Sequence, residues 1–335
     1  MRIHPPDSIT VVQIGKLGDM ILTTPLLRKL RSTFPHSTLQ VLASEHNSVI
    51  ADACGLADHV FIYHKHPVKD LKLLYSGLRK SDLWIDAKME PSDTSALFQR
   101  LFSPRSSLGY TNPKASFSID LKDFCSGDHY VDLQLAAIKA LGEDYSEEDR
   151  FPCLPLGDAI GISPLQASEK FRLKVLLNIS AGKEGRSLDH SVSEEIIGLI
   201  RSNPDAGIRI ISHPEESDSA ASLAKNTGSQ YIQTETILDA AREVSISDIV
   251  ISPDTSIIHI CSAYNKPVVG IYPDVDWNIR RFAPLSSVNE IVISDSDAGL
   301  KKVKPQKVAE AFLRLVDIVN SGNAESRTRV RKEDH

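Results

Sequence analysis

Short apolar runs alternate with amphipathic segments along most of the chain. In the first half, four apolar runs have the length of buried strands: residues 9–14, 39–42, 59–63 and 83–86. A further short run ends at residues 109–110. Four segments repeat apolar residues with the period of a helix: 24–33, 48–54, 69–78 and 129–141. This alternation is typical of a parallel sheet covered by helices on both faces.

The second half repeats the alternation more clearly. Its predicted strands are residues 173–180, 207–212, 230–233, 248–253 and 267–272. Its predicted helices are residues 192–201, 216–226, 237–244 and 256–263. Between the halves, residues 151–170 contain three prolines and two glycines and fit no period, which is typical of a linker.

These patterns predict an α/β protein with two doubly wound, Rossmann-like domains facing a cleft. The predicted domains are residues 1–157 and 168–304. A helix over residues 305–321 begins with a proline, and the tail at 322–335 mixes both charge signs with few apolar residues. We expect the tail to be disordered. Ligands are expected at the carboxyl ends of the strands, in the cleft between the domains.

Composition narrows the function classes. The chain has 335 residues, of which 41% are hydrophobic and 24% are charged, as in an ordinary soluble protein. Its net charge of −6 gives no basic face for nucleic acid. The four cysteines form no Cys-x-x-Cys pair and are interpreted as reduced thiols in the cytoplasm. No apolar run approaches the roughly 20 residues of a membrane span.

The first run leads into a glycine-bearing turn with a carboxylate at its end. Gly15, Lys16, Gly18 and Asp19 follow the predicted strand, and a predicted helix comes next. Such a turn usually favours an anion, because its amides and the helix N-terminus carry positive partial charge. Asp19 would repel that anion. The stretch therefore either caps a helix or performs a task other than holding a phosphate.

A second candidate site follows the strand at 248–253. Asp254, Thr255 and Ser256 lie at its carboxyl end, where a helix begins, and His259 lies one turn further on. Hydroxyls and free amides at a helix N-terminus suit an anion. The alternative is that Asp254 or Thr255 only caps the helix and His259 packs against the sheet.

A third candidate is the loop after the strand at 173–180. Ser180 opens it, and Lys183 and Arg186 give it two cations among glycines, which suits a diphosphate. A solvated basic loop is the alternative. The glycine spacing matches neither the nucleotide-binding P-loop nor the dinucleotide-binding motif, so ATPase and dehydrogenase functions have little support.

The ordered set of motifs resembles glycosyltransferase family 9, the heptosyltransferase family. The resemblance is carried by six stretches: G-x-L-G-D at 15–19 with TTPLLRKL at 23–30, then residues 82–102, SLGY at 107–110, residues 129–142, PDTSIIHICSAYNKPVVGIYP at 253–273, and RFAP at 281–284. It covers nearly the whole chain short of the tail.

The resemblance implies a two-domain GT-B fold and transfer of a sugar with inversion and without a metal. It implies no cofactor, since the nucleotide-sugar donor, ADP-heptose in that family, is a substrate. The donor would bind the second domain through Ser180, Lys183, Arg186 and the 254–259 stretch. The acceptor, a lipopolysaccharide-core glycan or glycolipid, would bind the first domain near Gly15, Lys16 and Gly18, and Asp19 would be the catalytic base.

A lipid-linked acceptor would also bring a cytoplasmic enzyme into peripheral contact with the inner membrane face. The basic residues of the tail suit an anionic surface, although acidic residues lie among them.

Two departures from the family leave a second function open. Ser256 stands where the family usually has glycine, and the 178–182 loop reads N-I-S-A-G where the family usually has N-P-G-A-S. The alternative is a nucleotide-sugar-binding protein on the same scaffold without transfer activity. A nucleotide-sugar epimerase is a more distant third, because the dinucleotide motif is missing.

Overall fold

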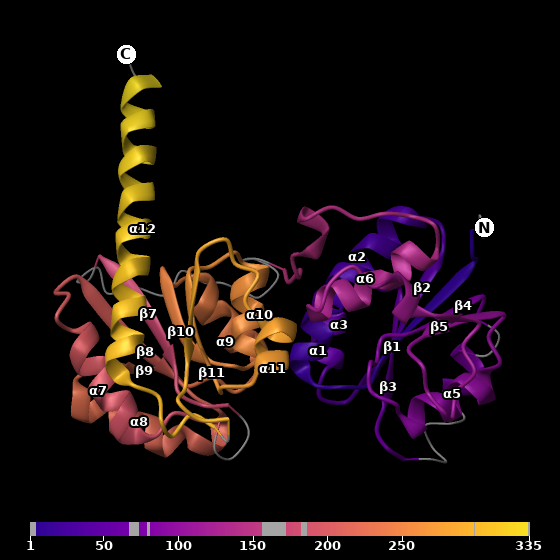
Figure 1. The fold of residues 1–335 in the computed structure, drawn as a ribbon, viewed down its shortest axis with the longest axis horizontal. Helices are drawn as coiled ribbons and strands as arrows, with labels where there is room; N and C mark the ends of the chain where they lie inside the picture. The colour runs from indigo at the N-terminus through magenta and orange to yellow at the C-terminus, as the bar shows by residue number, and fades with distance from the viewer. Residues whose placement is uncertain are drawn as a thin grey trace. The chain divides into compact units, whose positions relative to one another are not determined.

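The computed structural model describes residues 5–66, 74–78, 81–155, 172–181, 186–297 and 299–333, with side chains as far as residue 321. The chain divides into two compact units, Met1–Pro155 and Leu156–His335 (Figure 1). Each unit is built on one six-stranded sheet in which neighbouring strands are parallel. The α/β fold class expected from the alternation is confirmed for both units.

The first unit has the strand order β3-β2-β1-β4-β5-β6. Its strands are β1 (Ser8–Gln13), β2 (Thr38–Ser44), β3 (His59–Tyr63), β4 (Leu83–Asp86), β5 (Ser106–Gly109) and β6 (Ile119–Asp120). Its helices with described bounds are α1 (Leu17–Ile21), α2 (Thr24–Thr33), α3 (Ser48–Ala53), α5 (Asp93–Phe102) and α6 (Tyr130–Ala140).

The second unit has the order β12-β11-β10-β7-β8-β9. Read from the opposite edge, this is the same topology as in the first unit. Its strands are β7 (Leu173–Asn178), β8 (Ala206–Ile211), β9 (Gln230–Tyr231), β10 (Ile249–Pro253), β11 (Val268–Tyr272) and β12 (Asn289–Ile293). Its helices are α7 (His190–Ile200), α8 (Ser217–Thr227), α9 (Ile237–Ser245), α10 (Ser256–Ala263), α11 (Asp276–Phe282) and α12 (Pro305–Glu333).

In both units the direction of winding reverses between two adjacent central strands. These are β1 and β4 in the first unit and β7 and β10 in the second. In sheets of this type the connections at such a pair run to opposite faces, which opens a crevice outside the carboxyl ends of the two strands, where ligands bind. Each unit therefore has its expected ligand site at a position that the topology defines.

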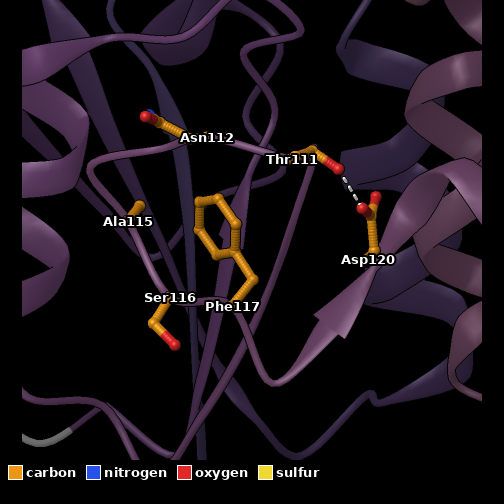
Figure 2. Close-up of a pocket in the computed structure, with 6 residues that line it drawn as sticks. All are labelled: Thr111, Asn112, Ala115, Ser116, Phe117 and Asp120. Atoms are coloured by element: carbon orange, nitrogen blue, oxygen red, sulfur yellow. Dashed lines mark hydrogen bonds between the residues drawn. The ribbon is translucent and has the colours of Figure 1, made fainter.

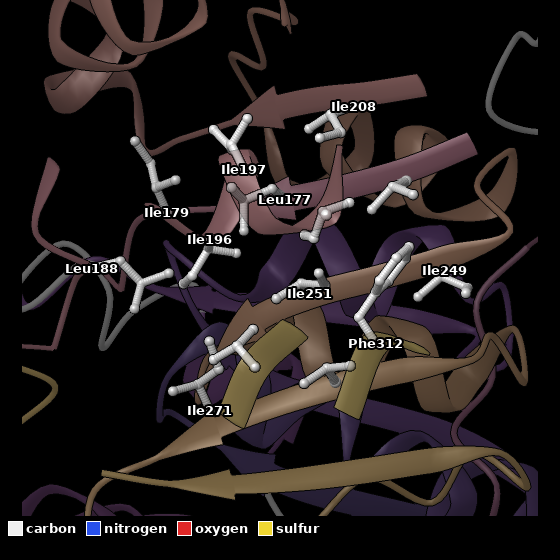
Figure 3. Close-up of a cluster of buried hydrophobic side chains, with 14 of the residues drawn as sticks. Leu177, Ile179, Leu188, Ile196, Ile197, Ile208, Ile249, Ile251, Ile271 and Phe312 are labelled. Atoms are coloured by element: carbon white, nitrogen blue, oxygen red, sulfur yellow. The ribbon is translucent and has the colours of Figure 1, made fainter. Parts of the chain in front are cut away.

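The central strands are apolar on both faces because helices cover both faces. In the second unit, Ile249 and Ile251 of β10 pack with Phe312 of α12 in one buried cluster (Figure 3). In the first unit, Trp84 of β4 is fully buried, and its ring lies 5.7 Å from that of Phe102. The sheets are thus rigid supports for the loops at their ends.

Five α-helices and strands of the described residues were not expected from the sequence: α1, α5, α11, β6 and β12. The five residues of α1 are too few to show a helical period. The expected helix at 69–78 and the linker at 151–170 lie partly outside the described residues.

The end of the chain also differs from expectation. α12 continues to Glu333 through residues predicted to form a disordered tail. Arginine and glutamate recur there and have high intrinsic helix propensity, so the helix extends beyond its apolar part.

Candidate functional site

The turn after β1 places Asp19 at the start of α1. Lys16 is the residue that caps this helix, and Asp19 is its third helical residue. The backbone N–H of Lys16 donates a hydrogen bond to Asp19 Oδ2 at 2.9 Å. The alternative in which Asp19 itself is the N-cap is therefore wrong in one detail: the N-cap is Lys16, and the Asp19 side chain accepts the N–H of that residue.

Gly15 leaves the space that the Asp19 side chain occupies. A Cβ atom built on Gly15 would lie 2.5 Å from Asp19 Oδ2 and 2.7 Å from Gln13 Oε1. Both distances are too short for real contacts, so any side chain at this position would displace one of the two oxygens. The first glycine of the motif is therefore explained by the close approach of the Asp19 carboxylate and not by a phosphate.

Gln13, the last residue of β1, is held by a buried network. Its Nε2 donates to Thr23 Oγ1 at 3.0 Å and to Tyr130 Oη at 3.2 Å. The Thr23 hydroxyl in turn donates to the backbone oxygen of Asp19 at 2.7 Å. The network ties the end of β1 to α1 and to α6.

Asp19 is half-buried, and burial is the main cause that raises its pKa. The Glu90 carboxylate acts in the same direction. The Lys16 N–H, the Lys16 ammonium and the Lys88 ammonium oppose it. Lys88 and Glu90 follow β4, the strand across the crevice from β1. A carboxylate with a raised pKa binds a proton more readily and is therefore suited to act as a general base.

In the second unit, Asn178 connects the ends of the two central strands. Its Nδ2 donates to Ser252 Oγ on β10 at 3.0 Å and lies 3.4 Å from Thr255 Oγ1. Asn178 also holds the next loop, because the same Nδ2 donates to the backbone oxygen of Ser180 at 3.0 Å. The hydroxyl of Ser180 is buried and has no hydrogen-bond partner within the described residues. A buried hydroxyl without a partner, at the carboxyl end of β7, is an available group for a ligand.

Thr255 is the N-cap of α10. Its Oγ1 accepts the backbone N–H of Ile257 at 3.2 Å, and Ser256 is the first helical residue. His259 is buried, and its ring lies 6.1 Å from the Phe282 ring. Thr255 thus caps the helix and His259 is buried, as the alternative to an anion site expects. The positive end of α10 nevertheless faces the crevice where an anion would bind.

Asp254 pairs with a cation and an amide. Its Oδ2 lies 3.5 Å from Arg186 Nη1 and accepts a hydrogen bond from Asn278 Nδ2 at 2.8 Å. This pairing orients the Arg186 side chain, while a bare carboxylate at the same place would repel a diphosphate. Lys183, the other predicted cation, lies outside the described residues.

The structure thus gathers Gly15, Lys16 and Asp19 at one crevice, with Gly18 in the first turn of α1. It gathers Ser180, Arg186, Asp254, Thr255 and Ser256 at the other, with His259 one turn along α10. Five contributors were not predicted from the sequence: Gln13, Lys88, Glu90, Asn178 and Asn278. The first four stand at or just after the carboxyl ends of β1, β4 and β7, where a sequence-based search could look for them, but nothing in the sequence around Asn278 on α11 indicates its role.

A separate cavity of about 230 Å³ lies beside the loop between β5 and β6 (Figure 2). It is lined by Thr111, Asn112, Ala115, Ser116, Phe117 and Asp120. The Thr111 hydroxyl donates to the Asp120 carboxylate, and the Asn112 amide bonds to Ser92 and Lys114. Its main polar side chains are thus engaged within the chain, and the cavity is not included in the candidate site.

Among the residues that the structure describes, no three or more His, Cys, Asp or Glu side chains gather as metal ligands would. No helix there combines the length and the apolar character needed to cross a bilayer.

The comparisons with known proteins agree with the motifs. Residues 189–312 match the family model of glycosyltransferase family 9 (heptosyltransferase). A Haemophilus influenzae protein named "Putative glycosyltransferase" is 22% identical over 343 residues, covering 94% of each chain. The resemblance to glycosyltransferase family 9 is confirmed.

Solved structures share the fold. The glycosyl transferase family 9 protein of Veillonella parvula superimposes with a TM-score of 0.75 at 15% identity, covering 94% of this chain and 98% of its own. The heptosyltransferase WaaC of E. coli with ADP-2-deoxy-2-fluoro heptose superimposes with a TM-score of 0.68 at 16% identity, covering 92% of this chain and 99% of its own.

Proposed function

We propose that this chain, whose residues 189–312 match glycosyltransferase family 9, is an inverting, metal-independent glycosyltransferase. Its donor is ADP-heptose, and its acceptor is a hydroxyl of a lipopolysaccharide-core-like or other glycan. The donor proposal is supported by the similar fold of WaaC, which was solved with ADP-2-deoxy-2-fluoro heptose. A lipid-linked acceptor places the protein in the cytoplasm, in peripheral contact with the inner membrane face.

The observation that carries the proposal is the position of Asp19. It lies at the crevice of the first unit, half-buried, with its pKa raised and its carboxylate fixed by the Lys16 N–H. In the proposed reaction Asp19 takes the proton of the acceptor hydroxyl. The acceptor oxygen then bonds to the anomeric carbon from the face opposite the diphosphate, and the bond from that carbon to the diphosphate oxygen breaks.

The second unit binds the donor and stabilises the leaving diphosphate. Arg186, oriented by Asp254, supplies a positive charge, and the N-terminus of α10 supplies partial positive charge. The Ser180 hydroxyl and Ser256 add hydrogen-bond donors, and Lys183 adds a second cation. This group replaces the metal that other transferases use at the diphosphate. His259, the fourth residue of α10, is the last member of this donor-binding set.

On the acceptor side, the exposed Lys16 flanks the base, and Gly15 and Gly18 keep the turn small. The unusual Ser256 and the altered loop at 178–182 keep the second function open. In that alternative the chain binds a nucleotide-sugar and transfers nothing.

The test is a panel of nucleotide-sugars assayed for binding and turnover. ADP-heptose is expected to raise the melting temperature, because a ligand that binds only the folded state stabilises it. It is also expected to be hydrolysed slowly, with release of ADP. Stabilisation without any ADP release, with or without glycan acceptors, would favour the non-catalytic alternative. No stabilisation by ADP-heptose or ADP would refute the donor assignment.

A further inference from the structure

The side-chain oxygen of Gln13 is buried near the Asp19 carboxylate and has no hydrogen-bond partner in the part of the chain that the structure describes. Gln13 is 0% exposed, and its Oε1 forms no hydrogen bond to the described residues. This oxygen and Asp19 Oδ2 contact the same side of Gly15, at 2.7 Å and 2.5 Å from the point where a side chain would begin. A buried amide oxygen without a donor is rare and needs an explanation.

The orientation of the Gln13 amide is fixed by its neighbours. The Thr23 hydroxyl has one hydrogen, which it donates to the backbone oxygen of Asp19. Thr23 Oγ1 can therefore only accept from Gln13, so the amide nitrogen must face Thr23 and Tyr130. The amide oxygen is consequently directed toward Gly15 and the Asp19 carboxylate.

We propose that Gln13 is a positioning residue whose Oε1 accepts a hydrogen bond from the Asp19 carboxyl group after it has taken the proton of the acceptor. This inference rests on the proposed function. No covalent bond of Gln13 changes, since the proton passes from the acceptor hydroxyl to Asp19 and stays there. Before transfer, the Gln13 amide oxygen and the ionised carboxylate lie on the same side of Gly15, and their repulsion disfavours the ionised form. After transfer, the same pair is a hydrogen bond.

Gln13 therefore acts in the same direction as burial on the basicity of Asp19. The charged groups that act on this carboxyl are Lys16 at the start of α1, and Lys88 and Glu90 after β4. Tyr130 on α6 also faces it, but burial raises the pKa of Tyr130 well above its ordinary value, so it stays neutral. The arrangement predicts that Gln13 sets how readily Asp19 holds a proton.

The test is a ¹³C NMR titration of the Asp19 carboxyl in three proteins. Gln13→Met keeps the length of the side chain but removes its oxygen, and the pKa of Asp19 should fall by about one unit, a tenfold change in proton affinity. Gln13→Glu should raise it, because a second carboxylate repels the ionised form. Gln40→Met is the control, since Gln40 is a buried glutamine of the neighbouring strand that bonds to Thr10.

Opposite shifts in the two Gln13 variants, with Gln40→Met unchanged, are the expected result, and a purely structural role would not produce them. An Asp19 pKa that is the same in wild type and in whichever Gln13 variant folds would overturn the inference. The titration needs no turnover, so it separates the two proposals. If the pKa shifts as expected but no nucleotide-sugar is consumed, the proposed function fails and the effect of Gln13 on the proton affinity of Asp19 stands.

Discussion

Gly15 and Asp19 occupy one small volume at the end of β1, where a Cβ atom on Gly15 would lie 2.5 Å from Asp19 Oδ2. The glycine is required by the carboxylate and the carboxylate is held by the turn. A turn whose glycines resemble those of a phosphate-binding loop thus holds the Asp19 carboxylate instead.

Gly15→Ala should displace the Asp19 carboxylate. If Asp19 is the base, a displacement of about 1 Å is expected to lower the transfer rate on the order of 100-fold. The control is Gly198→Ala in α7, where a Cβ atom meets nothing within 4 Å and should leave the rate unchanged. Transfer rates of both variants check this, and a fully active Gly15→Ala enzyme would show that the position of the carboxylate does not matter.

Arg186→Ala should weaken binding of ADP by at least roughly tenfold. A charge-assisted hydrogen bond contributes about 1.5–3 kcal/mol, and about 1.4 kcal/mol corresponds to a factor of ten. Arg201→Ala, an exposed arginine of the same unit, is the control and should bind normally. Calorimetric titration measures both, and unchanged affinity in Arg186→Ala would remove this side chain from the site.

Asp254→Asn tests the separate claim that Asp254 only orients Arg186. Asparagine keeps the size of the side chain but loses the ion pair, so ADP affinity should fall by less than in Arg186→Ala. The double variant should bind no worse than Arg186→Ala, because Asp254 acts through the arginine. Additive losses of ADP affinity in the same calorimetric titration would indicate an independent role for Asp254.

Asp86, the last residue of β4, should make the stability of the protein depend on pH. Burial raises the pKa of Asp86 to about 6, against an ordinary value of 3.8, although the Ser95 hydroxyl and the Lys88 N–H bond to it. The folded state therefore binds this proton more tightly than the unfolded chain. The stability that it contributes is fully present below pH 4 and is lost as the pH rises through about 6.

Asp86→Asn mimics the protonated form at every pH. Relative to wild type, its free energy of unfolding should increase by about 3 kcal/mol between pH 4 and pH 7, since two pK units correspond to that energy. Urea unfolding at both pH values checks this. A constant difference between the variant and wild type would mean that Asp86 titrates normally.

The sequence predicted the second unit better than the first because its elements are long and periodic. The helix at Ser256–Ala263 was predicted with the correct bounds, and so was α2 at Thr24–Thr33. The short α1 was missed because its five residues are too few to show a helical period. β12 is an edge strand with one buried residue, and its pairing with β11 stabilises it more than its own sequence does.

Some residues of the candidate site could be predicted from the sequence, and others could not. Asp19 and Thr255 follow strands and stand in motifs, so the sequence indicated them. The contact between Asn278 and Asp254 joins residues 24 positions apart through the fold, and no spacing rule predicts it. The free oxygen of Gln13 likewise becomes visible only when the hydrogen bonds of its neighbours are known.

The transfer rate of Asp19→Asn with ADP-heptose and a glycan acceptor tests the central claim most directly. Asparagine still accepts the Lys16 N–H, so the variant should fold and bind ADP as wild type does, but its amide cannot take the proton. The rate should fall by about 10²–10⁴-fold, the usual contribution of a general base. An Asp19→Asn protein that transfers the sugar at the wild-type rate would contradict the assignment of Asp19 as the base.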